Sequence, residues 1–209
     1  YQFMAKVVQG KPMAKNPALL TSTLRVMSLV IPFSVLMMVL RHEIILILFQ
    51  HGKFNAAATE LTSQILIFFL IGVFAFSAQT VVVRGYYAMG NTLFPAVFMT
   101  TAVLLSIPLY FYAMHTMGAR GIALAVSLSA IFQVLLLYGL WNKKRGNTES
   151  HRVYFFYVKI IIISLLIGVS LEWFKSEFLR AIDTSTFTGS IAVLGLIGTV
   201  FLGLFLLGG

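Results

Sequence analysis

The stretch QTVVVRGYYAMGNTLFP, which covers residues 79–95, decides the fold of this chain. A long apolar run ends at Arg84, and Gly90, Asn91 and Pro95 then supply residue types that favour a tight turn. A second apolar run starts directly after this turn. Because each run is long enough to cross a lipid bilayer, the stretch predicts a helical hairpin whose two arms span a membrane.

The composition of the whole chain is that of an integral membrane protein. Of the 209 residues, 59% are hydrophobic and only 10% are charged, whereas soluble domains carry about 25% charged residues. Cysteine is absent, which excludes a disulfide framework and a cysteine-ligated metal site. The first residue is Tyr1 and no signal-peptide pattern opens the chain, so we expect a piece of a longer polypeptide.

Continuous apolar runs predict six membrane-spanning helices. The predicted spans are residues 18–40, 61–83, 93–114, 122–141, 153–174 and 187–207. Runs of this length favour helices over the short alternating strands of a barrel, so the predicted fold class is all-α, a polytopic transmembrane helix bundle. Residues 44–49 are apolar but too short to cross, which predicts an interfacial segment. Asn55 is positioned to cap the helix that follows this segment.

Two features inside the spans bear on packing and movement. Pro32 and Pro108 lie well inside their spans, where a proline frees a carbonyl group and kinks the helix. Each is therefore a candidate hinge, with an ordinary packing kink as the alternative. Small side chains recur along the fourth span and suit close helix packing: Ala123, Ala125, Ser127, Ser129 and Ala130.

The distribution of lysine and arginine predicts the orientation. Nine lie on the side of the membrane that holds residues 1–17: Lys6, Lys11, Lys15, Arg25, Arg84, Lys143, Lys144, Arg145 and Arg152. Five lie on the opposite side: Arg41, Lys53, Arg120, Lys175 and Arg180. Most of the acidic residues also lie on that opposite side: Glu43, Glu60, Glu172, Glu177 and Asp183. The positive-inside rule places both ends in the cytoplasm, with residues 1–17 as a connector and residues 142–152 as a basic cytoplasmic loop.

Motifs that would indicate an enzyme are absent from the sequence. The four histidines lie in different loops or at span ends, without the paired spacing of a zinc site. Neither a phosphate-binding glycine-rich loop nor a Gly-x-Ser-x-Gly motif is present. None of the six acidic residues lies at the centre of a span, where a coupling carboxylate is usually found. The sequence predicts no catalytic residue, cofactor or metal site, and it predicts membrane lipids rather than nucleic acid as partners.

Three cations lie closest to the apolar runs, namely Arg25, Arg84 and Lys159. They either extend to lipid head groups or face an aqueous cavity, where a low dielectric strengthens attraction for a lipid diphosphate. Polar side chains inside the spans either line such a cavity or bond across helix contacts: Gln79, Thr80, Thr100, Thr101, Ser106 and Gln133. We take five of these residues as candidate substrate-binding residues: Arg84, Arg25, Lys159, Gln79 and Ser106.

Three short sequence elements follow one another between residues 40 and 141, and their order and spacing resemble those of a known family. The first contains Leu48, Phe49, Gly52 and Phe54; the second contains Arg84, Tyr87, Ala88, Asn91, Thr92 and Pro95; the third contains Gly121, Ala123, Leu124, Ala125, Ser127 and Ser129. Together they resemble the MurJ (MviN) family of lipid II flippases, in the multidrug/oligosaccharidyl-lipid/polysaccharide exporter superfamily. The last two spans resemble the family only in position and hydrophobicity.

The resemblance implies the last six of fourteen helices of a two-lobed transporter, which works by alternating access around a central cationic cavity. It makes residues 18–141 four spans of the C-terminal lobe and residues 153–209 an extra helix pair with a groove for a polyprenyl tail. Some family members bind sodium through an Asp in the helix that corresponds to residues 93–114. No carboxylate occurs in that helix here, which argues against a sodium site. The family's Asp-Thr-Arg turn is also altered, to Asn91-Thr92-Leu93.

The resemblance also implies a function, which is moving lipid II, the undecaprenyl-diphosphate-linked peptidoglycan precursor, across the bacterial cytoplasmic (inner) membrane. No bond is made or broken, and the partner within the same polypeptide is the N-terminal lobe. Alternatives are a polysaccharide-lipid or multidrug exporter of the same superfamily, and a scaffold without a cavity. A membrane-embedded transferase is a further alternative, for which Glu172, Glu177 and Asp183 form the one acidic cluster in the sequence.

Overall fold

A computed structural model describes residues 29–50, 52–88, 90–145, 150–178, 182 and 186–208. All regular structure in these residues is helical. The helices are Leu29–Val39, α3 (Arg41–Phe49), α4 (Ala56–Ala88), α5 (Leu93–Met117), α6 (Ala119–Arg145), α7 (Ser150–Phe178) and α8 (Phe187–Gly208). Helices α4 to α8 are each long and apolar enough to cross a membrane. The prediction of an all-α transmembrane bundle is confirmed.

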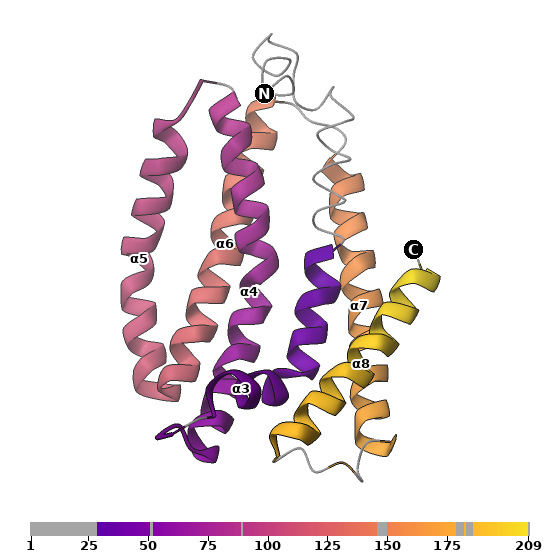
Figure 1. Cartoon of the computed structure of the whole chain (residues 1–209). Coiled ribbons are helices and arrows are strands. Elements are labelled where there is room, and N and C mark those ends of the chain that lie inside the picture. Colours follow the sequence, from indigo (N-terminus) through magenta and orange to yellow (C-terminus); the bar gives the residue numbers. More distant parts are fainter. Residues whose placement is uncertain are drawn as a thin grey trace.

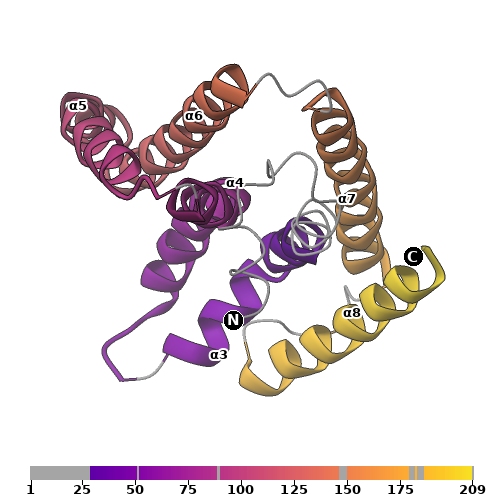
Figure 2. The same ribbon diagram turned by 90° about the horizontal axis from the view of Figure 1, so that it is seen from above.

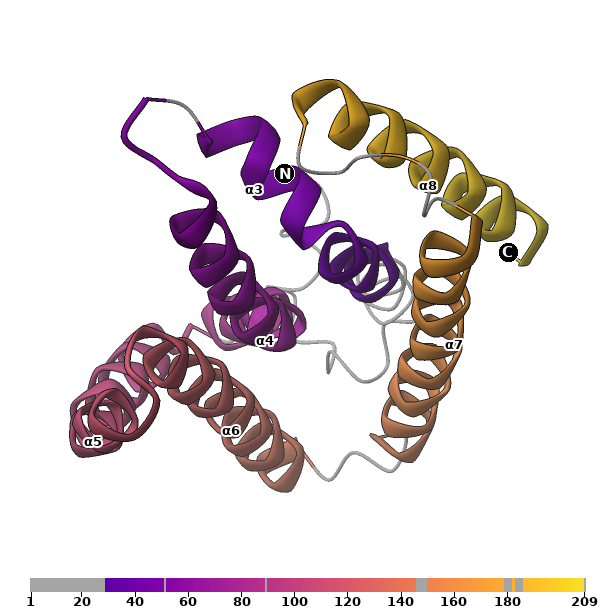
Figure 3. The ribbon, with the colours of Figure 1, turned by 90° about the horizontal axis from the view of Figure 1, so that it is seen from below.

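The first predicted span ends at a sharp bend, at the residue where the sequence predicts its end. Helix Leu29–Val39 stops at Leu40, and α3 leaves it at an angle of 74° (Figure 1). The predicted interfacial segment, residues 44–49, is thus most of α3, which lies across one end of the bundle (Figures 1 and 3). Helix Leu29–Val39 and α3 together are called the broken helix below.

Neither proline stands at this break. Pro32 lies in the described helix Leu29–Val39, eight residues before Leu40. Helix α5 continues without interruption through Pro108. The predicted connector, residues 1–17, and the first part of the predicted first span lie outside the described residues, as does Arg25.

Local side-chain bonds explain where the helices begin. The Oδ1 atom of Asn55 accepts a hydrogen bond from the backbone N–H of Ala58 at 2.9 Å, which confirms the predicted cap of α4. At the hairpin, Gly90 has a φ of +72°, a left-handed conformation that costs glycine little. The Oδ1 atom of Asn91 then accepts from the backbone N–H of Phe94 at 3.1 Å, in the first turn of α5. These residues build the tight turn that the sequence predicts.

The polar loop predicted at residues 142–152 is shorter than expected. Helix α6 continues to Arg145 and α7 already begins at Ser150. Lysine and arginine are good helix formers, and cations are favoured at a helix C-terminus by the helix dipole. The basic run that suggested a loop therefore extends α6.

The helices form two groups that the broken helix joins. Helices α4, α5 and α6 pack on one another on one side, and α7 and α8 cross each other on the other side (Figures 1 and 2). Helix α3 contacts α4 in the first group and α8 in the second (Figure 3). The broken helix therefore contacts both groups.

Small side chains bring α4 and α6 together. The Oγ atom of Ser127 donates a hydrogen bond to the backbone oxygen of Phe68 at 2.6 Å. A Cβ atom added to Gly72 would lie 2.8 Å from the Cα atom of Ser127, so the two backbones approach closely at this glycine. The small residues predicted to favour close packing are all buried: Ala123, Ala125, Ser127, Ser129 and Ala130. Their predicted role in helix packing is confirmed.

Tyr86 connects the ends of three helices. Its side chain is buried, and its hydroxyl donates a hydrogen bond to the backbone oxygen of Leu137 on α6 at 3.1 Å. Its ring stacks on Phe94 of α5, with ring centroids 5.2 Å apart. Tyr87, the tyrosine that belongs to the family-like element, is exposed.

We expect Tyr86→Phe to lower the free energy of unfolding by about 1 kcal/mol, because one net hydrogen bond is lost. Tyr86→Ala should cost about 3–5 kcal/mol, because a buried aromatic side chain is removed. Thermal unfolding of the purified protein in detergent, followed by intrinsic fluorescence, measures both changes. Tyr87→Phe is the matched control and should leave the midpoint unchanged. Equal effects of the two Tyr→Phe changes would contradict the role assigned to Tyr86.

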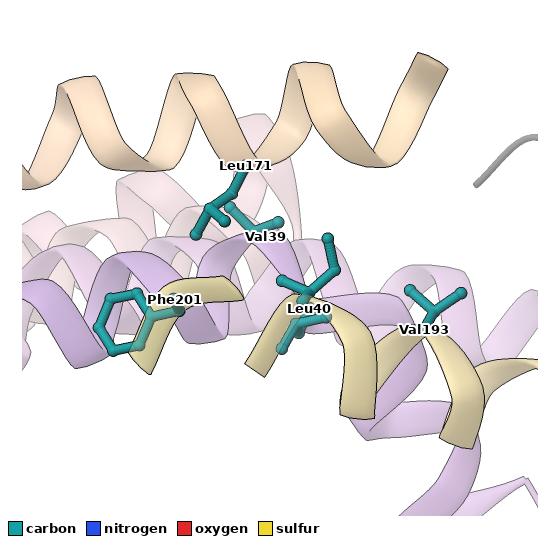
Figure 4. Packing of buried hydrophobic residues seen from close by; sticks show 6 residues of the cluster. Val39, Leu40, Leu171, Val193 and Phe201 are labelled. Atoms are coloured by element: carbon teal, nitrogen blue, oxygen red, sulfur yellow. The ribbon is translucent and has the colours of Figure 1, made fainter. Parts of the chain in front are cut away.

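A second core attaches α7 and α8 to the broken helix. Buried apolar side chains from the broken helix, α7 and α8 meet there (Figure 4): Val39, Leu40, Leu171, Val193, Ile197 and Phe201. Phe33 adds an edge-to-face contact with Phe201, with centroids 5.4 Å apart. Gly168 of α7 packs so closely on Val35 that an added Cβ atom would lie 2.4 Å from its Cγ1 atom.

Candidate functional site

The break at Leu40 interrupts the backbone hydrogen bonding of the span and leaves carbonyl groups at the C-terminus of helix Leu29–Val39. Two cations supply donors to these carbonyls. The Nζ atom of Lys175 donates to the backbone oxygen of Val39 at 3.1 Å. The guanidinium of Arg41 donates to the backbone oxygen of Met38 at 2.8 Å. Positive charge at this end is also favoured by the helix dipole, so the break is stabilised by its surroundings.

Lys175 also forms an ion pair with Glu43. Its Nζ atom lies 2.8 Å from Oε1 and 3.0 Å from Oε2 of the carboxylate. The Glu43 side chain is 1% exposed and that of Lys175 is 19% exposed. Glu43 lies in the first turn of α3, where the helix dipole favours negative charge. One lysine on α7 thus contacts both halves of the broken helix.

The sequence indicated part of this arrangement. Charge counting placed Glu43 and Lys175 on the same side of the membrane, which is a condition for their pairing. It did not pair them, and neither residue was a candidate site residue. The sequence signal for such a pair is a set of opposite charges at the ends of two distant spans. This signal does not show which lysine or arginine on that side pairs with Glu43.

An apolar pocket lies between α7 and α8. It has a volume of about 420 Å³ and is lined by Val169, Ser170, Leu171, Trp173, Phe174, Val200 and Leu204. Leu171 belongs both to this lining and to the core around the break. Phe174 lines the pocket and directly precedes Lys175. A pocket with this lining suits a hydrocarbon chain.

The structure separates the predicted substrate-binding residues. Arg84 lies exposed on α4, and Lys159 lies exposed on α7. Gln79 is half-buried on α4, and Ser106 is half-buried on α5. None of these four side chains lines the pocket between α7 and α8.

The two candidate cations that the structure describes, Arg84 and Lys159, both point away from the neighbouring helices. Arg84 comes two residues before Tyr86, which faces α6, and two residues turn a helix by about 200°. Lys159 comes five residues before the buried Ser164, which places it about 140° away around α7. Each cation is therefore open to lipid head groups or to a partner outside these helices.

Two of the polar side chains inside the spans bond within their own helices. Ser106 donates from Oγ to the backbone oxygen of Ala102 at 2.8 Å, and Thr80 donates from Oγ1 to that of Phe76 at 3.1 Å. A helix-to-helix hydrogen bond comes instead from Ser127, one of the small residues predicted to favour close packing.

The acidic cluster of the transferase alternative is only partly described. Glu172 and Glu177 are exposed on α7, and Asp183 lies outside the described residues. Within the part of the chain that the structure describes, no group of three or more His, Cys, Asp or Glu side chains is placed to bind a metal ion.

Comparison with known sequences identifies relatives along most of the chain. A family model described as "Lipid II flippase MurJ" matches residues 4–192. A "Probable lipid II flippase MurJ" from Rickettsia prowazekii (strain Madrid E) is 21% identical over 201 residues, which cover 96% of this chain and 39% of the relative. The "Lipid II flippase MurJ" of Thermosipho africanus (strain TCF52B) is 34% identical over 107 residues, which cover 51% of this chain and 22% of the relative.

Comparison with solved structures identifies the same fold. A structure titled "Lipid II flippase MurJ, inward closed conformation" matches 97% of this chain with a TM-score of 0.71 and 24% sequence identity. The chain covers 41% of that structure and 39% of the Rickettsia relative, so it spans about two-fifths of their length. The family model extends over all three family-like sequence elements and over nearly all the described helices. This chain belongs to the lipid II flippase MurJ family.

Proposed function

We propose that this chain is the C-terminal part of a transporter that moves lipid II across the bacterial cytoplasmic membrane by alternating access. The observation that carries the proposal is the match of the lipid II flippase model to residues 4–192. The fold shared with a solved flippase supports it. The proposed activity moves a lipid and makes or breaks no bond, so the protein is not an enzyme.

The proposed binding mode divides the substrate between two regions. The diphosphate lies near Arg84, Arg25 and Lys159, and Gln79 and Ser106 supply polar contacts. The outward placement of Arg84 and Lys159 supports this, because both side chains are open to a substrate or to the N-terminal lobe. The apolar lining of the pocket between α7 and α8 supports a site there for part of the polyprenyl tail.

The proposed movement is a rocking of the two lobes, with both ends of this chain in the cytoplasm. The excess of lysine and arginine on the side of residues 1–17 supports that orientation. Pro32 and Pro108 remain the proposed flexible points, since a proline removes one backbone hydrogen bond from a helix. The broken backbone at Leu40 is a third position where the span already lacks continuous hydrogen bonding.

We expect Arg84→Ala in the full-length protein to reduce delivery of lipid II by about ten- to a hundredfold, because a charge-assisted contact with the diphosphate contributes about 1.5–3 kcal/mol. Cells depleted of their own flippase are complemented with the parent or the variant, and lipid II accessible in the periplasm is measured. Arg120→Ala is the matched control. Arg120 is exposed at the start of α6, on the opposite side of the membrane in the proposed orientation, and its loss should leave delivery unchanged.

Two other outcomes would change the assignment. Delivery that is equal for the parent and for Arg84→Ala would make Arg84 a head-group contact and not a transport residue. A parent that is present in the membrane at normal levels but delivers no lipid II would contradict the assignment. It would favour a polysaccharide-lipid or multidrug exporter of the same superfamily.

A further inference from the structure

We propose that Lys175 and Glu43 are positioning residues for the lipid tail, because they hold the α7 wall of the apolar pocket in place against the broken helix. This inference rests on the proposed function and deepens it, since it assigns residues to the placement of the tail site. Neither residue touches the tail in this proposal. Both act through the position of α7.

Helices α7 and α8 are attached to the broken helix. Although α7 follows α6 in the sequence, its main packing in the described part of the chain is with α8 and the broken helix, and not with α6 (Figure 2). Helix α8 in turn packs on α3. The position of the pocket relative to α4, α5 and α6 is therefore set at the broken helix.

Directional contacts at the break determine the rotation and height of α7. Apolar packing around Val39, Leu40 and Leu171 is non-directional, so it permits small rotations of α7. The ammonium of Lys175 has three donors, and three acceptor atoms surround it. They are Oε1 of Glu43 at 2.8 Å, Oε2 of Glu43 at 3.0 Å and the oxygen of Val39 at 3.1 Å. These directional contacts select one position of α7 at the break.

Lys175 is linked to the pocket through its neighbours on α7. Leu171 lies one helical turn before Lys175, on the same face of α7, and it both lines the pocket and packs against the broken helix. Phe174, the residue before Lys175, also lines the pocket. A rotation of α7 that moves Lys175 away from Glu43 must therefore move both pocket side chains relative to Val200 and Leu204 on α8.

The ion pair is deeply buried on its Glu43 side. The Glu43 carboxylate is 1% exposed, so water cannot replace Lys175 as its partner without the site opening. A single substitution leaves one charge buried and unpaired, whereas a matched pair of apolar residues does not. The informative variant is therefore the double substitution Glu43→Leu with Lys175→Met, which removes the directional contacts and both charges together.

The experiment uses the full-length protein and a polyprenyl diphosphate probe that carries a photoactivatable diazirine in its tail. In the parent, we expect labelling of the α7 segment around Trp173. In the double variant, labelling of that segment should fall about tenfold, while the amount of bound diphosphate stays unchanged. Lys175→Arg keeps the charge and several donors and should retain labelling. Lys53→Met, at an exposed lysine in the turn before α4, is the matched control and should label as the parent does.

Exchanging the two charges supplies a sharper test. In Glu43→Lys with Lys175→Glu the ion pair can re-form, but a carboxylate then faces the Val39 oxygen, which needs a donor. We expect no recovery of labelling. Recovery by the exchanged pair would show that charge pairing alone is sufficient, and it would overturn the assigned role of the Val39 contact. If the apolar double variant is not recovered from membranes, Glu43→Gln with Lys175→Met also removes both charges and keeps an acceptor at residue 43. Labelling like that of the parent in this variant would overturn the positioning role.

The outcomes separate this inference from the proposed function. A parent that delivers lipid II, combined with a double variant that labels like the parent, overturns the positioning role and leaves the function in place. A parent that neither delivers lipid II nor binds the probe overturns the proposed function, and the inference with it. Reduced labelling together with a proportional loss of bound diphosphate indicates a general structural role and also overturns the inference.

Discussion

Gly72→Leu is expected to break the packing of α4 on α6 and to lower the thermal midpoint of the protein by about 6–12 °C. The side chain must enter a space where even a Cβ atom would lie 2.8 Å from the Cα atom of Ser127. The helices must separate, and the bond from Ser127 to the Phe68 oxygen is lost with the contact. Overpacking of this kind costs about 3 kcal/mol, and each kcal/mol is about 2–4 °C in a chain of this size.

Thermal unfolding in detergent and the monodisperse fraction after size-exclusion chromatography measure this change. Gly139→Leu is the control, because a Cβ atom added at Gly139 of α6 meets no atom within 4 Å. The same side chain should be tolerated there. If both leucine variants lose the same stability, helix propensity or membrane insertion is responsible, and the close α4–α6 contact is not.

Gly121→Ala is expected to destabilise the protein by about 2–3 kcal/mol, although it adds a single methyl group. The added Cβ atom would lie 2.1 Å from the backbone oxygen of Ala113, which cannot move aside as a flexible side chain would. The chain is already tightly turned here, since Gly118 has a φ of +62° and its N–H donates to the Met114 oxygen at 2.9 Å. The hairpin between α5 and α6 must open to accept the methyl group.

The control for this prediction should change the stability in the opposite direction. Gly139→Ala is the same substitution in the same helix at an open position, and it should stabilise α6 by up to about 1 kcal/mol, because alanine is the better helix former. Denaturant or thermal unfolding in detergent compares the two variants. A Gly121→Ala protein as stable as the parent would contradict the tight approach of α5 to α6.

The helices that cross the membrane were predictable because each is encoded within its own segment. Apolar runs such as residues 61–83 have one stable conformation in a bilayer, where every backbone polar group must be bonded inside the helix. The hairpin at Gly90 and Asn91 was predictable for a similar reason, since its turn chemistry is local. The small residues of α6 indicated close packing, and the structure adds that Gly72 is the matching residue on α4.

The end of the first span at residue 40 was predicted, but the contacts that stabilise the break there were not predictable from local signals. No proline or glycine lies at Leu40, and the two prolines inside the spans, Pro32 and Pro108, lie elsewhere. The carbonyl of Val39 is compensated by Lys175, which lies 136 residues later in the chain. Local sequence patterns do not reveal a compensation over such a distance.

The start of the loop predicted at residue 142 was wrong for a different reason. The polarity of residues 142–145 suggested a loop, whereas lysine and arginine extend a helix well.

The candidate substrate residues stay predictions for a physical reason. Arg84 and Lys159 face outward from the helices of this chain, so their role depends on the lipid and on the N-terminal lobe of the proposed transporter. Gln79 and Ser106 lie on different helices from Lys159, and none of the three lines the pocket between α7 and α8. The complementation experiment with Arg84→Ala addresses this part directly.

The buried pair at the break also limits how family members can be recombined. The connection between α6 and α7 invites a chimaera that takes α7 and α8 from another member. Such a graft would separate residue 175 from residue 43, which lies 132 positions earlier in the chain. A donor without a cation at the position of Lys175 would leave the Glu43 carboxylate buried without a counter-charge. A functional hybrid must therefore inherit both residues from one parent, or exchange both for apolar residues.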